Sequence, residues 1–217
     1  MKKSLKILLV LIIPFSIFSQ NDYKLKTKVA VSANDICPVL VGEKIPDIIL
    51  TDINSKQFNL NNLIKQKPTI LVIYRGGWCP FCNRQLENLI KIEPNLISLG
   101  YQLVAISIDR PDKLKESLNN HKINYTLLSD SSAIASIALG LAFKVDDKTI
   151  EKYKKFNINL ETASGMNHHI LPVPAVFIIG KDEIIKYEYI NPNYSERLNS
   201  DLLLSTAKFY MEEFVKK

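Results

Sequence analysis

Two cysteines separated by two residues form the part of this sequence best suited to chemistry. Cys79 and Cys82 enclose Pro80 and follow two glycines. A thiol reacts as its thiolate, and a thiolate is favoured at the start of a helix, where backbone N–H groups are unpaired and the helix dipole is positive. Proline suits the first position of a helix, because that position needs no amide donor. The pattern therefore predicts Cys79 as a helix N-cap, Cys82 in the first turn, and a redox role for both.

A metal site is the alternative reading of the same pair. Cys-x-x-Cys is half of a structural zinc site, and no second such pair is present to complete it. The remaining ligands would have to be drawn from His121, His168, His169 and Cys37. A c-type haem site is excluded, because Asn83 stands where that motif requires histidine. A metal-binding module that uses Cys79, Cys82 and a histidine therefore stays open as a function of another class.

The elements that must position the cysteines can be predicted from the apolar pattern. Residues 69–74 are apolar on both faces, which indicates a central strand covered on two sides. The helix that follows is predicted over residues 80–99, with Pro94 expected to kink or split it. Further strands are predicted at residues 47–52, 58–60, 103–108, 125–128, 175–179 and 183–189, and further helices at residues 61–65, 111–121, 131–138, 146–156 and 200–215. Strands that alternate with helices predict an α/β fold with a partly parallel sheet.

The first residues have the pattern of a secretory signal peptide. Lys2, Lys3 and Lys6 precede an apolar run that ends near Phe18, and the small residue Ser19 follows. We expect cleavage near Ser19, an N-terminal arm over residues 20–41, and one domain over residues 42–217. The run is short for a membrane span, so an uncleaved anchor is the less favoured alternative. The sequence therefore predicts an exported protein, periplasmic or secreted, with no membrane attachment after cleavage.

Charge and cysteine count limit the partners. The chain carries a formal charge of +6, and loss of the three lysines of the signal segment leaves +3. That balance does not suggest nucleic acid as a partner. Three cysteines remain after cleavage, and an odd number cannot form a closed disulfide framework. Outside the cytosol a disulfide persists unless another protein reduces it, so a redox couple here needs a reducing partner.

Five segments of the chain together resemble the alkyl hydroperoxide reductase/thiol-specific antioxidant (peroxiredoxin-like) family of the thioredoxin-fold superfamily. The resemblance rests on residues 42–47, 74–82, 103–109, 125–130 and 173–175. It implies a thioredoxin-like α/β fold, a central mixed β-sheet flanked by helices. It also implies a cis peptide bond before Pro174, with that proline beside the active cysteines. No cofactor is implied.

The resemblance leaves two assignments of the cysteines open. Peroxiredoxins carry Pro-x-x-x-Thr-x-x-Cys around the attacking cysteine, and neither cysteine restores that motif. With Cys82 as the attacking residue, Cys79 replaces the threonine and Arg75 the proline. With Cys79 as the attacking residue, Gly76 replaces the threonine and Val72 the proline. In the first case Cys82 attacks a peroxide and Cys79 resolves the sulfenic acid; in the second, glutaredoxin-like case Cys79 attacks a disulfide and Cys82 resolves.

The predicted function is peroxide reduction through a Cys79/Cys82 redox couple, with electrons from a thioredoxin-like thiol carrier. The alternative within the same class is a thioredoxin- or glutaredoxin-like disulfide reductase. Arg75 is expected to steer the peroxide or to lower a thiol pKa, and Trp78 to pack beside the site. His169, or its neighbour His168, is a candidate proton donor or acceptor. Cys37 is a weaker candidate for a resolving thiol.

Overall fold

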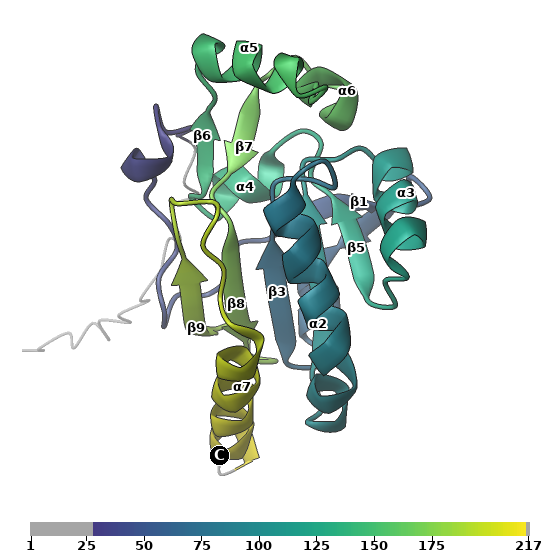
Figure 1. Ribbon diagram of the computed structural model, residues 1–217. Helices are drawn as coiled ribbons and strands as arrows, with labels where there is room; N and C mark the ends of the chain where they lie inside the picture. The colour runs from purple at the N-terminus through teal and green to yellow at the C-terminus, as the bar shows by residue number, and fades with distance from the viewer. Residues whose placement is uncertain (1–27, 216–217) are drawn as a thin grey trace, which may run out of the picture.

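A strand of five consecutive buried residues organises the structure. In the computed structural model, which describes residues 28–215, this strand is β3 (Thr69–Ile73). It lies inside a seven-stranded sheet of order β2-β1-β5-β4-β3-β8-β9 (Figure 1). The other strands are β1 (Ile49–Asp52), β2 (Gln57–Asn59), β4 (Gln102–Ser107), β5 (Thr126–Ser129), β8 (Ala175–Ile179) and β9 (Ile185–Ile190). The predicted strand of continuous apolar character is therefore confirmed as a central one.

The sheet is mixed, as predicted. β3 pairs with β4 in parallel and with β8 in antiparallel fashion. β4 continues in parallel with β5, while β1, β2 and β9 add antiparallel pairs at the two sides. The parallel pairs require crossover helices between their strands, and α2 (Pro80–Ser98) and α3 (Pro111–His121) supply them. The turn that follows β3 therefore leads directly into a helix, and the two cysteines lie where that helix begins.

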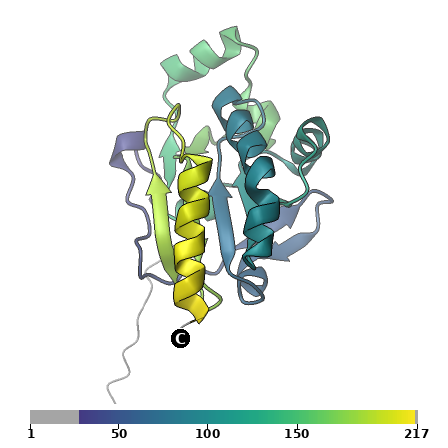
Figure 2. The same cartoon turned by 60° about the horizontal axis from the view of Figure 1, so that its bottom comes forward.

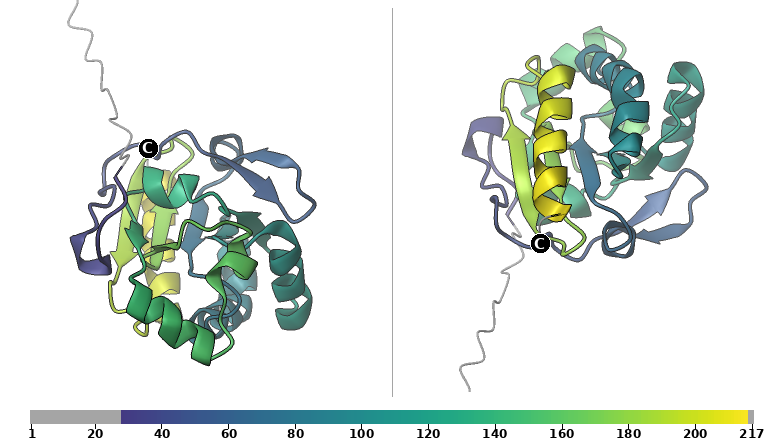
Figure 3. Two further views of the ribbon diagram at one scale, coloured as in Figure 1. Left: turned by 90° about the horizontal axis from the view of Figure 1, so that it is seen from above. Right: turned by 90° about the horizontal axis from the view of Figure 1, so that it is seen from below.

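Alternate residues of β3 face two separate cores. Ile70 and Val72 pack with residues of α2, α3 and α7 (Ser200–Val215). Leu71 and Ile73 pack on the other face with residues of α1 (Leu60–Ile64) and α4 (Ile134–Ala138). Figure 2 and the right-hand view of Figure 3 show α2 and α7 side by side over one face of the sheet. The cysteines belong to the core on the α2 side.

A second, two-stranded sheet lies beyond the end of the main sheet at which α2 begins (Figure 1). It consists of β6 (Ala142–Lys144) and β7 (Ile170–Pro172), and between them run α5 (Asp147–Lys155) and α6 (Leu160–Ser164). The sequence predicted α5 but neither strand nor α6, since three- and five-residue elements carry too little periodicity. The described part of the N-terminal arm joins this sheet: Ala30 exchanges backbone hydrogen bonds with Ala142 and Lys144. It also forms a short 3-10 turn, Ala33–Asp35.

Neither the split expected at Pro94 nor the cis bond expected before Pro174 occurs in the described residues. Helix α2 runs unbroken through Pro94, which is exposed, so the missing N–H costs one backbone bond without ending the helix. No peptide bond in residues 28–215 is cis, so the bond before Pro174 is trans. The trans form is intrinsically favoured, and here it keeps the chain extended between β7 and β8, where Val173 N–H donates to the Leu141 carbonyl at 2.9 Å.

The predicted signal peptide, residues 1–19, lies outside the described residues. Among residues 28–215, no helix combines the length and the apolar character needed to span a bilayer. The start of the domain at residue 42 stays a prediction.

Candidate active site

The two cysteines stand at the beginning of α2, as the sequence predicted. Cys79 is the N-cap, with extended backbone (φ −95°, ψ 113°), Pro80 opens the helix, and Cys82 is in the first turn. The turn is closed by Cys79 N–H, which donates to the Gly76 carbonyl at 3.1 Å. Gly76 has φ +149°, and a Cβ there would lie 2.3 Å from the Trp78 indole nitrogen. Only glycine fits at this position, which explains why the turn before the cysteines begins with one.

Both thiols are reduced and buried. Cys79 is 1% exposed and Cys82 0%, and neither forms a disulfide. No ordinary cap hydrogen bond runs from the first-turn amides to the Cys79 sulfur, contrary to the simple expectation for an N-cap. The Cys82 amide is nevertheless close enough to favour the thiolate. The helix start therefore contributes to Cys79, and side chains contribute more.

The environment shifts the pKa values of the two thiols in opposite directions. A hydrogen bond from the Cys82 thiol, opposed by burial and supported by Arg75, lowers the pKa of Cys79 from 9.0 to about 6. Burial, followed by the interaction with Cys79, raises the pKa of Cys82 well above its ordinary value. At neutral pH the pair is therefore a thiolate at Cys79 held by a thiol at Cys82. The sequence left the choice of nucleophile open, and this charge distribution favours Cys79.

Arg197 reaches the pair from the segment between β9 and α7. Its Nη2 donates to the Cys82 sulfur at 3.5 Å, and its Nη1 donates to the Glu196 carbonyl at 2.8 Å. Its positive charge favours the thiolate form of both cysteines, although burial outweighs this effect at Cys82. The sequence indicated no role for this residue. Arginine is rare in this chain, which has four, and that rarity was the one sequence feature that could have drawn attention to Arg197.

Arg75 also acts on Cys79, from inside a group of aromatic rings. It is 3% exposed. Its guanidinium lies 4.1 Å from the ring centre of Tyr194, 5.0 Å from that of Trp78 and 5.5 Å from that of Tyr153. Its Nη2 also donates to the Tyr153 hydroxyl. Cation–π contacts offset part of the cost of burying this charge, so Arg75 acts as a fixed cation beside Cys79. Tyr153 on α5 and Tyr194 were not predicted, because they are remote in sequence.

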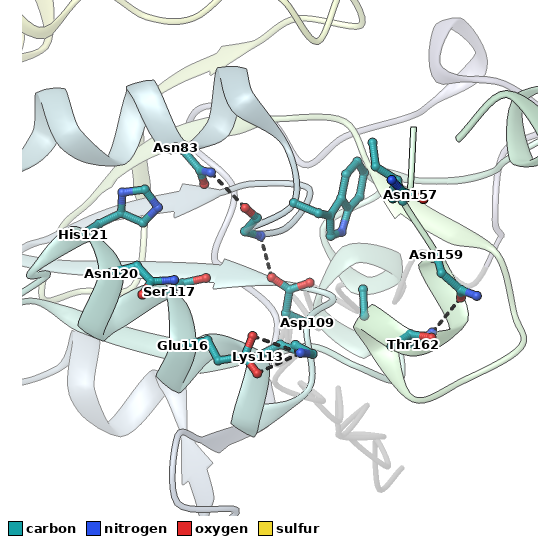
Figure 4. Close-up of a pocket in the computed structure, with 14 residues that line it drawn as sticks. Asn83, Asp109, Lys113, Glu116, Ser117, Asn120, His121, Asn157, Asn159 and Thr162 are labelled. Carbon is teal, nitrogen blue, oxygen red and sulfur yellow. Dashed lines mark hydrogen bonds and ion pairs between the residues drawn. The ribbon is translucent and has the colours of Figure 1, made fainter. Parts of the chain in front are cut away.

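A polar cleft of about 460 Å³ lies next to the turn (Figure 4). Asp109, which follows β4, forms part of its wall and is 1% exposed. One oxygen accepts from Gly77 N–H at 2.6 Å, while the other has no partner in the described residues. Burial is the largest cause that raises the pKa of this carboxyl, to about 7. Asp109 thus fixes the backbone two residues before Cys79 and titrates near neutral pH.

Other predicted residues are placed as follows. Pro174 directly precedes β8. Because Ala175 pairs with Ile73, Pro174 lies at the end of β3 from which the cysteine turn departs.

The two histidines contact other groups. His169 Nε2 contacts Glu161 Oε1 at 2.7 Å, and His168 Nε2 contacts the Ser131 carbonyl at 2.8 Å. Each histidine thus contacts a group other than the sulfurs, and the proton-transfer role stays a prediction. Cys37 is exposed and forms no disulfide, and its resolving role stays a prediction.

The ligands that a metal would need are not assembled. In the part of the chain that the structure describes, no three His, Cys, Asp or Glu side chains come together in a geometry that suits a metal ion. Cys79, Cys82 and a histidine do not form such a group among residues 28–215.

Comparison with known proteins agrees with this geometry. A model of the AhpC/TSA family matches residues 41–188. Peroxiredoxin Bcp of Escherichia coli (strain K12) is 30% identical over 93 residues, which is 43% of this chain and 59% of that protein. The thiol-disulfide oxidoreductase ResA of Bacillus thuringiensis is 24% identical over 91 residues, 42% of this chain and 51% of that protein. The match thus spans somewhat more than half the length of these relatives.

Solved structures share the fold at low sequence identity. Peroxidoxin BcpB of Mycobacterium tuberculosis aligns with a TM-score of 0.61 and 17% identity, over 80% of this chain and 96% of that one. A peroxiredoxin-like protein from Aquifex aeolicus aligns with a TM-score of 0.64 and 18% identity, over 84% and 97% of the two chains. The predicted thioredoxin-like α/β fold is confirmed.

Proposed function

The chain belongs to the AhpC/TSA family, and from that premise we propose that it is an exported thiol oxidoreductase that reduces peroxides through Cys79 and Cys82. The observation that carries the proposal is the unequal pair of touching thiols. Cys79 has a pKa of about 6, and the buried Cys82 holds its proton. A nucleophile and a resolving thiol are thus already in contact before any oxidant arrives.

The reaction follows from the protonation states. The Cys79 thiolate attacks one oxygen of the peroxide, the O–O bond breaks, and the leaving oxygen departs as an anion that takes a proton to become an alcohol or water. Cys79 becomes a sulfenic acid. The Cys82 thiol then displaces its hydroxyl, and a Cys79–Cys82 disulfide and one water form. Two electrons from an external thiol donor return the disulfide to two thiols.

Cys79 is the attacking residue in this proposal. The nucleophile must be ionised at neutral pH, and Cys79 meets this condition while Cys82 does not. Arg197 contacts the sulfur of Cys82, the resolving thiol in this proposal. The proline and threonine of the peroxiredoxin motif are absent, so the proposal assigns the stabilisation of the leaving oxygen to Arg75 and Arg197.

Disulfide reduction is the second candidate. The Cys-Pro-Phe-Cys segment and the similarity to a ResA protein favour it. The burial of Cys79 argues the other way, since a sulfur that is 1% exposed admits a small peroxide more readily than the disulfide of a folded protein. We therefore place a peroxide first among substrates, and propose a thioredoxin-like carrier as electron donor and the periplasm or the exterior as the location.

Stopped-flow mixing of the reduced protein with hydrogen peroxide tests the proposal, because Trp78 is the only tryptophan and adjoins Cys79. We expect a second-order rate far above that of free cysteine. Cys82→Ser should accumulate a sulfenic acid at Cys79, and Cys79→Ser should react no faster than free cysteine. If Cys79→Ser retains the fast phase, the assignment is wrong. Turnover of insulin disulfides without any peroxide reaction would favour the second candidate.

A further inference from the structure

Two cations and one anion meet at the thiol pair. Arg75 and Arg197 both act on Cys79, which is the one ionised thiol at neutral pH. In residues 28–215, neither guanidinium forms an ion pair with a carboxylate. No direct carboxylate contact therefore neutralises either guanidinium, and an unmatched charge is costly to bury, above all at Arg75, which is 3% exposed.

The two guanidiniums also hold unused donors. The Nε atoms of Arg75 and Arg197 are buried and have no hydrogen-bond partner. Arg75 is held by Tyr153 and the aromatic rings, and Arg197 by the Glu196 carbonyl and the Cys82 sulfur. Both side chains are thus fixed from elsewhere, and the Nε–H group of each has no acceptor. Preorganised guanidinium donors are the groups that proteins use to bind carboxylates and other oxyanions.

The approach to this site is aromatic. Tyr194, whose ring covers Arg75, is 42% exposed, and it contacts Phe81 edge-on with ring centres 5.8 Å apart. Phe81 belongs to the cysteine tetrad itself. A ligand that reaches the sulfur from this side meets apolar ring surface before it meets the two cations.

We propose that Arg75 and Arg197 form an oxyanion-binding site beside Cys79, and that the preferred substrate is an organic hydroperoxide that bears a carboxylate near its O–O bond. This inference rests on the proposed function and narrows its substrate class. The carboxylate binds to the guanidiniums, and the apolar part lies on Tyr194 and Phe81. The hydroperoxide is held at the Cys79 sulfur, and its O–O bond is cleaved as described above. The same cations then stabilise the alkoxide until it takes a proton from water.

A matched pair of substrates tests the proposal. Cumene hydroperoxide with a ring carboxylate is compared with its methyl ester, and the second-order rate of Cys79 oxidation is measured for each. We expect the acid to react about tenfold faster than the ester, equivalent to ~1.4 kcal/mol. The rate for the acid should fall as ionic strength rises from about 0.01 M to about 0.15 M, and the rate for the ester should not. Equal rates, or a faster ester, overturn the proposal.

Arginine variants locate the effect. Arg197→Gln should bring the acid-to-ester ratio close to one, and Arg197→Lys should retain most of it. Arg84→Gln is the matched control, since Arg84 lies on α2 with the cysteines, is exposed and faces Phe81. The ratio is the readout, because any change in the reactivity of Cys79 affects both substrates equally. If Arg84→Gln lowers the ratio as much as Arg197→Gln does, the effect is a general surface charge and the proposal fails.

A binding measurement separates this proposal from the peroxidase assignment. Benzoate is titrated into the reduced protein by calorimetry, without any peroxide. We expect benzoate to bind the wild-type protein and Arg84→Gln, and to bind Arg197→Gln at least about tenfold more weakly. Benzoate binding without peroxide turnover would disprove the peroxidase function and keep the anion site. Peroxide turnover without benzoate binding would disprove the anion site and keep the peroxidase function.

Discussion

Removal of the Cys82 thiol should raise the pKa of Cys79 by more than any other single change at the site. The pKa of Cys79 falls from 9.0 to about 6, and the hydrogen bond from Cys82 is the largest cause. A difference of about 3 units corresponds to ~4 kcal/mol. A hydrogen bond to a charged group contributes ~1.5–3 kcal/mol, or about 1–2 units. Cys82→Ala should therefore move the pKa of Cys79 to about 7–8.

The assay is the rate of iodoacetamide alkylation as a function of pH, with Cys37→Ser as background because Cys37 is exposed. The midpoint is the quantity to compare, since the limiting rate at high pH rises as a thiolate becomes more basic. Cys82→Ser is the matched control, because its hydroxyl still donates to the thiolate. We expect its midpoint to stay near that of the wild type. Equal midpoints for Cys82→Ala and Cys82→Ser would refute the role of the hydrogen bond.

Three further changes probe the surroundings of the pair. Arg197→Gln should raise the pKa of Cys79 by less than Cys82→Ala does, since the charge of Arg197 lowers that pKa less than the hydrogen bond from Cys82 does, and the same alkylation titration measures it. In the wild type, ionisation of Asp109 should lower the free energy of unfolding between pH 4 and pH 8, by up to ~4 kcal/mol. Asp109→Asn should abolish this decrease. The sign follows because a carboxyl whose pKa is raised to about 7 in the folded protein favours folding only while protonated, and urea denaturation at both pH values checks it. Cys37→Ser should leave the rate of peroxide reduction unchanged in stopped flow, and a large loss would assign Cys37 a resolving role.

The sequence predicted those parts of the site that local rules determine. Gly76, Pro80 and the spacing of the cysteines specify a strand, a tight turn and a helix start, and each of these depends on the residues themselves. The apolar run of β3 likewise specifies a strand covered on both faces. These predictions needed no knowledge of distant segments, and the structure confirms them.

The parts that the sequence did not predict depend on distant residues. Arg197 donates to a sulfur 115 positions away, and Tyr153 is 78 positions from Arg75. No periodic pattern encodes such contacts, because they depend on where α5 and the segment before α7 fold back. Conversely, His169 was placed near the cysteines from its position before Pro174, but it contacts Glu161 on α6, an element that the sequence did not reveal.

The charges around the pair also indicate how the cycle closes. In the reduced protein the Cys79 thiolate is stabilised by Cys82, Arg75 and Arg197. Formation of the disulfide removes that negative charge, and both guanidiniums then lose their only ionised partner among the described residues. Interactions that favour the reduced form make a disulfide a stronger oxidant, because the reduction potential reports the free-energy difference between the two forms. The groups that make Cys79 reactive toward a peroxide therefore also make the resulting disulfide easy to reduce. The proposed cycle, in which a separate thiol donor reduces the disulfide after every turnover, needs both properties, and the Cys82 hydrogen bond together with the two arginines accounts for them.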